Sequence, residues 1–354
     1  MLAWQSHIAF LPSSGKIWMK SENTAIYNIH GTTFKAVFSD QRIGIICDAF
    51  FRPYRCDSVS EKYEIVFKKI DHKLLSFSRK ASSSTLSEEG CQSICLEEGF
   101  LVSCEPAKKR VTCLYSEEVL TEEENTELKA LYLFHDGFLP KNAYGVRSTF
   151  FWFLEQLGTF RLHAAFVEYC GHDIIIAGHG YVGKTTSAIN IALNGGIIYC
   201  DDAVYFREGP EGAIEIFPEI RKLSVTPKTL EFFPEISSLE ELEQIIGYST
   251  SCKGQLSVTK SNDLSKTRRG VPDVLIFPSI LEEETVFPRI VAKSAYEGFI
   301  TMLDDNITLP PVSNNSRVKQ LDLIEKLTNQ VEIFSLSTCR DMKANFQVIK
   351  NVIT

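Results

Sequence analysis

Residues 178–186 combine glycines with a lysine and two threonines at a spacing that suits phosphate chemistry. They read Gly-His-Gly-Tyr-Val-Gly-Lys-Thr-Thr, and the first eight match the phosphate-binding pattern Gly-x-x-x-x-Gly-Lys-Thr. Glycines let successive backbone N–H groups point at phosphate oxygens. The sequence therefore predicts a nucleoside triphosphate site made by Gly178, His179, Gly180, Tyr181, Val182, Gly183, Lys184, Thr185 and Thr186.

The elements around this glycine loop fit a phosphate site. An apolar run at 173–177 predicts a buried strand before the loop, and 185–193 predicts a helix after it. This order places the positive end of the helix beside the phosphates. We also expect a hairpin on each side, one over 163–176 and one over 203–217.

Two carboxylates, Asp201 and Asp202, follow a short apolar strand predicted at 197–200. We expect this strand to lie beside the strand before the loop, so that both end where ligands bind in open α/β sheets. Carboxylates there can hold Mg²⁺ or accept a proton from an attacking hydroxyl. The alternative is an Asp pair that only begins a turn. The nearby glycine loop favours the functional interpretation.

The loop glycines also match Gly-x-Gly-x-x-Gly, the fingerprint of a dinucleotide site, with an acidic residue downstream. Asp201 would then bind a ribose, and the chemistry would be redox. Lys184 and Thr185 have no role in such a site. The hairpins predicted on both sides also differ from a strand–helix–strand unit. The triphosphate interpretation is therefore favoured.

The segment 162–206 resembles the catalytic domain of HPr kinase/phosphorylase and its relatives, which include stand-alone serine kinases of peptide-biosynthesis clusters. The resemblance rests on His163 at the start of a strand, the glycine loop, the Asp pair and the spacing between them. It extends over roughly residues 145–310. It implies an α/β catalytic domain with a mixed sheet, of the type shared with phosphoenolpyruvate carboxykinases, and ATP and Mg²⁺ as cofactors.

The resemblance also implies catalytic roles. Asp201 would be the general base that takes the proton of a serine or threonine hydroxyl, and Lys184 would contact the β- and γ-phosphates. His163 would lie beside the phosphates and tune the Asp pair; the alternative is a histidine bonded within the core.

Metal and phosphate contacts are implied at four further positions. Asp202 would hold Mg²⁺ together with Thr185, and Glu219 is a tentative third ligand. Arg221 would contact phosphate, although Glu219 and Arg221 could equally form an exposed ion pair. Tyr181 departs from the family, whose loops usually carry glycine at that position.

The segment after Arg221 also lacks the glycines of the family, which favours a single-purpose kinase over a bifunctional regulator. A basic loop over 253–270 could close over the phosphates or be an ordinary solvated loop.

Composition limits the partners. The formal net charge of -8 argues against a dedicated nucleic-acid binder. No apolar run is as long as a membrane span, and the N-terminus lacks the features of a signal peptide. We therefore expect a cytoplasmic protein with neither nucleic-acid nor membrane partners. The ten cysteines lack zinc-finger spacing, which favours scattered thiols.

Two domains are expected. Residues 1–124 form a smaller, mainly antiparallel β domain that could read the substrate, with strands at 33–38, 42–47, 63–67, 100–104 and 110–115. Residues 125–354 form the kinase domain with C-terminal helices, beginning with helices at 125–133 and 146–157. The aromatic block 150–153 favours a buried helix over a ligand site.

The predicted function is an ATP-dependent kinase that phosphorylates a serine or threonine of a peptide or small protein. One alternative is a kinase of a small hydroxylated metabolite, and another is a nucleotide-binding regulatory module that transfers nothing. The sequence leaves open the acceptor and the oligomeric state, a homo-oligomer included.

Overall fold

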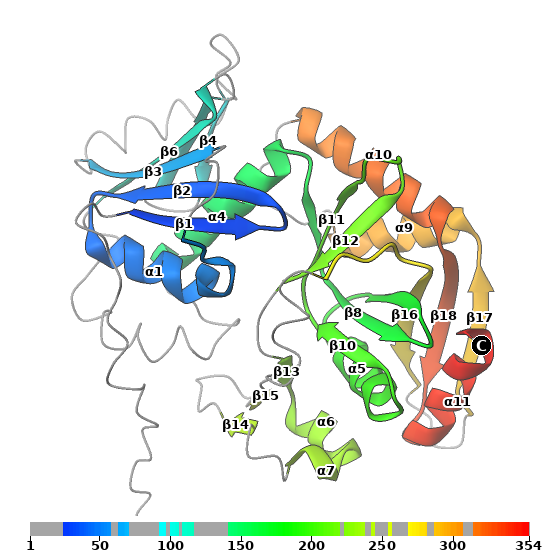
Figure 1. Ribbon diagram of the computed structural model, residues 1–354. Coiled ribbons are helices and arrows are strands. Elements are labelled where there is room, and N and C mark those ends of the chain that lie inside the picture. The colour runs from blue at the N-terminus through cyan, green and yellow to red at the C-terminus, as the bar shows by residue number, and fades with distance from the viewer. Residues whose placement is uncertain are drawn as a thin grey trace, which may run out of the picture.

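The structure is a computed structural model and describes residues 24–57, 63–70, 92–96, 100–105, 108–116, 141–219, 223–237, 242–244, 254–256, 268–281, 287–306 and 314–353. Over these residues the chain has a mixed α/β fold that contains four sheets. An N-terminal unit, which is blue to cyan in Figure 1 apart from its green helix α4, lies beside a larger C-terminal unit, green to red. No helix of the described ranges is both long and apolar enough to cross a membrane.

A six-stranded sheet with the order β1-β2-β3-β6-β5-β4 forms most of the N-terminal unit. Its strands are β1 (Thr24–Ile29), β2 (Thr32–Phe38), β3 (Tyr63–Ile70), β4 (Gln92–Leu96), β5 (Phe100–Glu105) and β6 (Arg110–Ser116). The strands predicted at four of the five positions are therefore confirmed. The sheet is mixed, because β3 runs parallel to both β2 and β6.

The strand predicted at 42–47 is wrong, because this segment is part of helix α1 (Gln41–Phe51). The Asp40 side chain accepts a hydrogen bond from Arg42 N at 2.9 Å and caps the helix. Ile43, Ile46 and Cys47 follow helical spacing and are buried. An apolar run this short fits the periodicity of a strand as well as that of a helix, and the Asp40 cap favours the helix.

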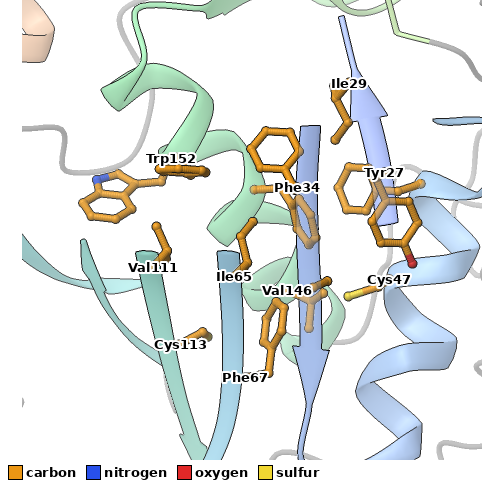
Figure 2. Packing of buried hydrophobic residues seen from close by; sticks show 14 of the residues in the cluster. Tyr27, Ile29, Phe34, Cys47, Ile65, Phe67, Val111, Cys113, Val146 and Trp152 are labelled. Carbon is orange, nitrogen blue, oxygen red and sulfur yellow. The ribbon is translucent and has the colours of Figure 1, made fainter. Parts of the chain in front are cut away.

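Helix α4 (Lys141–Gln156) fills the core of the N-terminal unit (Figure 2). The Phe150 ring lies at the centre of this core, in contact with the rings of Tyr27, Phe34, Phe51 and Phe67. Packing as the role of the aromatic block is thus confirmed. The domain boundary predicted at 124/125 and the helix predicted at 125–133 lie outside the described residues.

The C-terminal unit is built on a second six-stranded sheet with the order β10-β8-β9-β16-β18-β17. Its strands are β8 (Ala164–Tyr169), β9 (His172–Ala177), β10 (Ile197–Cys200), β16 (Val274–Ile280), β17 (Arg289–Lys293) and β18 (Glu332–Thr338). β8 and β9 form the predicted hairpin. Cys170 and Gly171 make its two-residue turn, both with positive φ, the geometry that suits tight hairpins.

Both faces of this sheet are covered by helices (Figure 1). Along β9, Ile175 and Ala177 pack on the side of α9 (Ala295–Asn306) and α10 (Asn314–Gln330). Ile174 and Ile176 pack on the other side, with α5 (Lys184–Leu193) and α11 (Met342–Ile353). A strand buried on both faces explains the continuous apolar run in the sequence.

Two small sheets complete the C-terminal unit. One has the order β12-β11-β7 and consists of β7 (Phe160–Leu162), β11 (Val204–Glu208) and β12 (Ile214–Pro218). β11 and β12 form the second predicted hairpin. The other has the order β13-β15-β14 and consists of β13 (Leu223–Val225), β14 (Leu242–Gln244) and β15 (Gly254–Leu256).

The two units share apolar contacts. Tyr205 of β11 and Phe217 of β12 belong to the same core cluster as the N-terminal sheet and α4. The His30 ring packs against both of these rings, and Arg207 donates a hydrogen bond to the His30 backbone oxygen at 3.2 Å. The three-stranded sheet β12-β11-β7 therefore connects the N-terminal unit to the rest of the chain.

A buried carboxyl near the end of α4 makes stability depend on pH. Glu155 is 6% exposed, and its Oε2 has no hydrogen-bond partner among the described residues. Burial raises the pKa of Glu155 to about 7. Between pH 4.5 and 7 the folded protein therefore holds a proton that the unfolded chain releases, so this carboxyl lowers the free energy of unfolding as pH rises.

We predict that Glu155→Gln increases the free energy of unfolding at pH 8 by on the order of 2 kcal/mol and leaves it unchanged at pH 5. Urea unfolding at the two pH values measures this difference. Glu211→Gln, in an exposed turn, is the control and should show no pH-dependent gain. An equal effect of Glu155→Gln at both pH values would contradict the prediction.

Candidate functional site

The chain crosses between the six-stranded sheet of the C-terminal unit and the three-stranded sheet β12-β11-β7 at two places. His163 joins β7 of the three-stranded sheet to β8 of the six-stranded sheet, and residues 201–203 join β10 to β11. The pairing of Leu162 with Val204 brings these crossings together. For this reason His163 and the Asp pair are neighbours in the structure although they are far apart in the sequence.

The same sheet edge also carries the glycine loop. β10 and β9 are each antiparallel to β8, so they run in the same direction and end at the edge where β8 begins. The expectation that β10 lies directly beside β9 is wrong, since β8 lies between them. This order also differs from the strand–helix–strand unit of a dinucleotide site, in which the strand after the helix pairs with the first strand.

The loop has the backbone of a tight turn that leads into a helix. Gly178 and Gly183 have φ of 143° and 102°, and Tyr181 has a positive φ of 67° with its ring 76% exposed. Gly183 caps α5 without a side-chain hydrogen bond. As a glycine, the N-cap has no side chain to accept from the first N–H groups of α5, and such groups at a helix start suit an anion.

Lys184 and the two threonines begin helix α5. Lys184 is 6% exposed, and its Nζ donates to the backbone oxygens of Gly178 and, at 2.7 Å, His179. The lysine ammonium therefore lies against the loop. The Thr186 hydroxyl lies 3.1 Å from that of Thr229 and ties α5 to helix α6 (Pro227–Phe232).

The two aspartates have different surroundings although they are adjacent. Asp201 is 2% exposed, and Thr185 Oγ1 donates to its Oδ2 at 3.5 Å. Asp202 is half-buried; its Oδ1 lies 3.0 Å from His163 Nε2 and its Oδ2 3.2 Å from Arg161 Nη2. The threonine thus contacts Asp201, and the expectation that Thr185 and Asp202 hold one Mg²⁺ stays a prediction.

Glu219 lies between two arginines. Its Oε1 accepts a hydrogen bond from Arg147 Nη2 at 2.7 Å, and its Oε2 lies 3.5 Å from Arg161 Nε. Two cations make Glu219 a poorer candidate for a metal ligand than Asp202. Arg221 lies outside the described residues.

Arg147 and Arg161 were missed by the sequence interpretation. In Phe160-Arg-Leu-His163 the strand alternation places Arg161 on the same face as His163, which is a signal for it. Arg147 gives a weaker signal, as the only charged residue between Lys141 and Glu155.

The described part of the basic loop does not cover the glycine loop. Arg268 forms ion pairs with Asp173 and, at 3.3 Å, with Glu168, and Arg269 lies 3.3 Å from Glu215. Asp173 lies near the start of β9, whereas the glycine loop follows its end. Arg268 therefore holds the segment before β16 to the start of β9, at the opposite edge of the six-stranded sheet, and Arg269 holds it to β12.

The site offers two carboxylates, a hydroxyl and an imidazole to a metal. No group of three or more His, Cys, Asp or Glu side chains among the described residues is arranged as a complete metal site. This still fits Mg²⁺, which is usually bound through one or two carboxylates plus waters and substrate phosphates. The uncapped start of α5, the lysine at the loop and the Thr185 hydroxyl beside a carboxylate together suit a magnesium-bound triphosphate.

Comparison with known proteins gives little. No protein-family model matches the chain, and no curated protein matches it. Among solved structures, the HPr(Ser) kinase/phosphatase from Coxiella burnetii is similar with a TM-score of 0.27 and 10% sequence identity, over 55% of this chain and 95% of that one. A TM-score this low cannot support a fold or an activity, so the function has to be argued from the site.

We predict that Gly183→Ala lowers the free energy of unfolding by about 1–3 kcal/mol, because alanine at this φ of 102° is strained. Chemical denaturation measures the change. Gly180→Ala is the matched control in the same loop, since a Cβ there meets nothing within 4 Å and its φ is not positive. Equal effects of the two substitutions would show that the loop does not hold this conformation.

Proposed function

We propose that the protein is an ATP-dependent kinase that transfers the γ-phosphate to a serine or threonine hydroxyl of a peptide or small protein. The contact between Thr185 and Asp201 carries the proposal, because it joins the start of the loop helix to the Asp pair. One sheet edge thereby presents groups for a triphosphate and groups for an attacking hydroxyl.

The residues of the glycine loop would bind the nucleotide. Backbone N–H groups from Gly178 to Gly183 and the start of α5 would bind phosphate oxygens, with Lys184 against the β- and γ-phosphates. Thr185 and Asp202 would hold Mg²⁺, which neutralises charge on the phosphates when bound. The groups are held on a strand end and a helix start, so little reorganisation is needed.

Asp201 would act as the general base. As the acceptor oxygen attacks the γ-phosphorus, the carboxylate takes the hydroxyl proton, and the bond from phosphorus to the bridging oxygen breaks, leaving ADP and a phosphate ester. His163 would orient Asp202 through the 3.0 Å contact between them. The Thr185–Asp201 contact also fits exchanged roles, with Asp201 on the metal side and Asp202 as the base.

We predict that Lys184→Ala abolishes ATP binding, whereas Asp201→Asn retains binding and lowers transfer about a hundredfold or more. Binding is measured by calorimetry and transfer with γ-labelled ATP, followed by mass spectrometry of acceptors. Lys326→Ala, which removes an exposed ion pair with Glu208, is the control. Transfer only to small metabolites would favour the metabolite kinase. ATP binding without any transfer would favour the regulatory module. Full transfer by Asp201→Asn would refute the assignment of Asp201 as the general base.

A titration with Mg²⁺ separates the two aspartates. We predict that Asp202→Asn raises the Mg²⁺ concentration needed for nucleotide binding about tenfold, because a carboxylate of the metal site is lost. Asp201→Asn should leave this concentration unchanged. Fluorescent ADP binding at increasing Mg²⁺ measures this. The opposite result would assign the metal to Asp201 and the proton to Asp202.

A further inference from the structure

A series of ion pairs leads from helix α4 to the Asp pair. Arg147 is paired with Glu219 at 2.7 Å, Glu219 with Arg161 at 3.5 Å, and Arg161 with Asp202 at 3.2 Å. Asp202 in turn lies 3.0 Å from His163. The series therefore begins in the core of the N-terminal unit and ends at the candidate site.

Arg147 is fixed by its surroundings. Its guanidinium lies over the Phe151 ring at 4.8 Å and over the Phe50 ring at 5.5 Å, and the side chain is 10% exposed. Phe50 belongs to α1, so the cation is held by two helices of the N-terminal unit. It nevertheless pairs with Glu219, which follows β12 of the C-terminal unit.

Arg161 is shared between two carboxylates. Its Nε faces Glu219 and its Nη2 faces Asp202, a division that the planar guanidinium permits. The four side chains balance, with two cations and two anions. Loss of one buried member would leave an uncompensated charge, which a neighbour would then attract. Arg147 thus neutralises Glu219 and leaves Arg161 available to Asp202.

We propose that Arg161 is a positioning residue for Asp202 and that Arg147 controls it through Glu219, so that the N-terminal unit regulates the transfer site. Withdrawal of Arg147 frees Glu219 to draw Arg161 away from Asp202. Glu219 then acts as a bridge between the units and not as a metal ligand. The regulatory meaning rests on the proposed kinase function, whereas the linkage between Arg147 and Asp202 does not.

The linkage is tested without nucleotide. Unfolding equilibria of the wild type, Arg147→Met, Asp202→Asn and the double variant form a cycle between residues that the ion-pair series connects only indirectly. We expect the two changes to be non-additive by about fivefold or more in the unfolding constant, since they disturb one network. Additive changes would overturn the proposal. If Arg147→Met does not fold, Arg147→Lys replaces it and should give a smaller coupling of the same sign.

The matched control is Arg207→Met. Arg207 of β11 also connects the units, through its hydrogen bond to the His30 backbone oxygen, but it is not part of the series. Its cycle with Asp202→Asn should be additive to within about twofold. A coupling as large as that of Arg147 would show a general effect of loosening the units and would also overturn the proposal.

Kinetics test the regulation. Arg147→Met should lower kcat about tenfold or more and change the KM for ATP less than about threefold, because a reacting group is misplaced while the loop is intact. Adding Glu219→Gln to Arg147→Met removes the stray charge and should restore kcat to within about threefold of the wild type. A merely structural role of Arg147 predicts no such rescue, so its absence refutes the regulation. A wild type without transfer would refute the kinase function and leave the unfolding cycle to decide the linkage.

Discussion

β8 runs antiparallel to both of its neighbours, and the candidate site depends on this reversal. The two-residue turn at Cys170 and Gly171 fixes β8 against β9, and the pairing with β10 makes the second reversal. Strand starts and strand ends therefore meet at one edge. A parallel neighbour in the place of β8 would carry His163 to the opposite edge, away from the glycine loop and the Asp pair.

The interior and the edge of this sheet have opposite chemistry. β9 is buried by apolar side chains on both faces, which holds the strand rigidly. Carboxylates follow the ends of β10 and β12, and their desolvation is unfavourable unless cations and hydrogen bonds compensate for it. Arg147 and Arg161 supply that compensation from outside the six-stranded sheet. The N-terminal unit is therefore part of what permits carboxylates to lie at this edge.

Local features could be predicted from the sequence, and non-local ones could not. The hairpin at β8–β9, the loop and helix α5 follow from periodicity and turn residues that lie within a few positions of one another. The strand prediction for 42–47 was wrong because its apolar run fits both the strand and the helix periodicity, and only the Asp40 cap distinguishes them. The prediction that β10 lies beside β9 was wrong because strand pairing across a sheet depends on segments that are distant in sequence. Strand alternation could have placed Arg161 on the face of His163, but its contact with Asp202 depends on the pairing of β7 with β11.

Adjacent residues at a sheet crossing can serve different parts of a molecule. Asp201 faces Thr185 at the start of the loop helix, whereas Asp202 faces Arg161 and His163 on the side of the three-stranded sheet. β11 and β12 of that sheet also pack into the N-terminal core through Tyr205 and Phe217. One member of the Asp pair thus contacts the start of the loop helix, and the other is connected to Arg147 of the N-terminal unit only through Arg161 and Glu219. Under the proposed function, this division would let the position of the N-terminal unit alter the chemistry at Asp202 without touching the nucleotide.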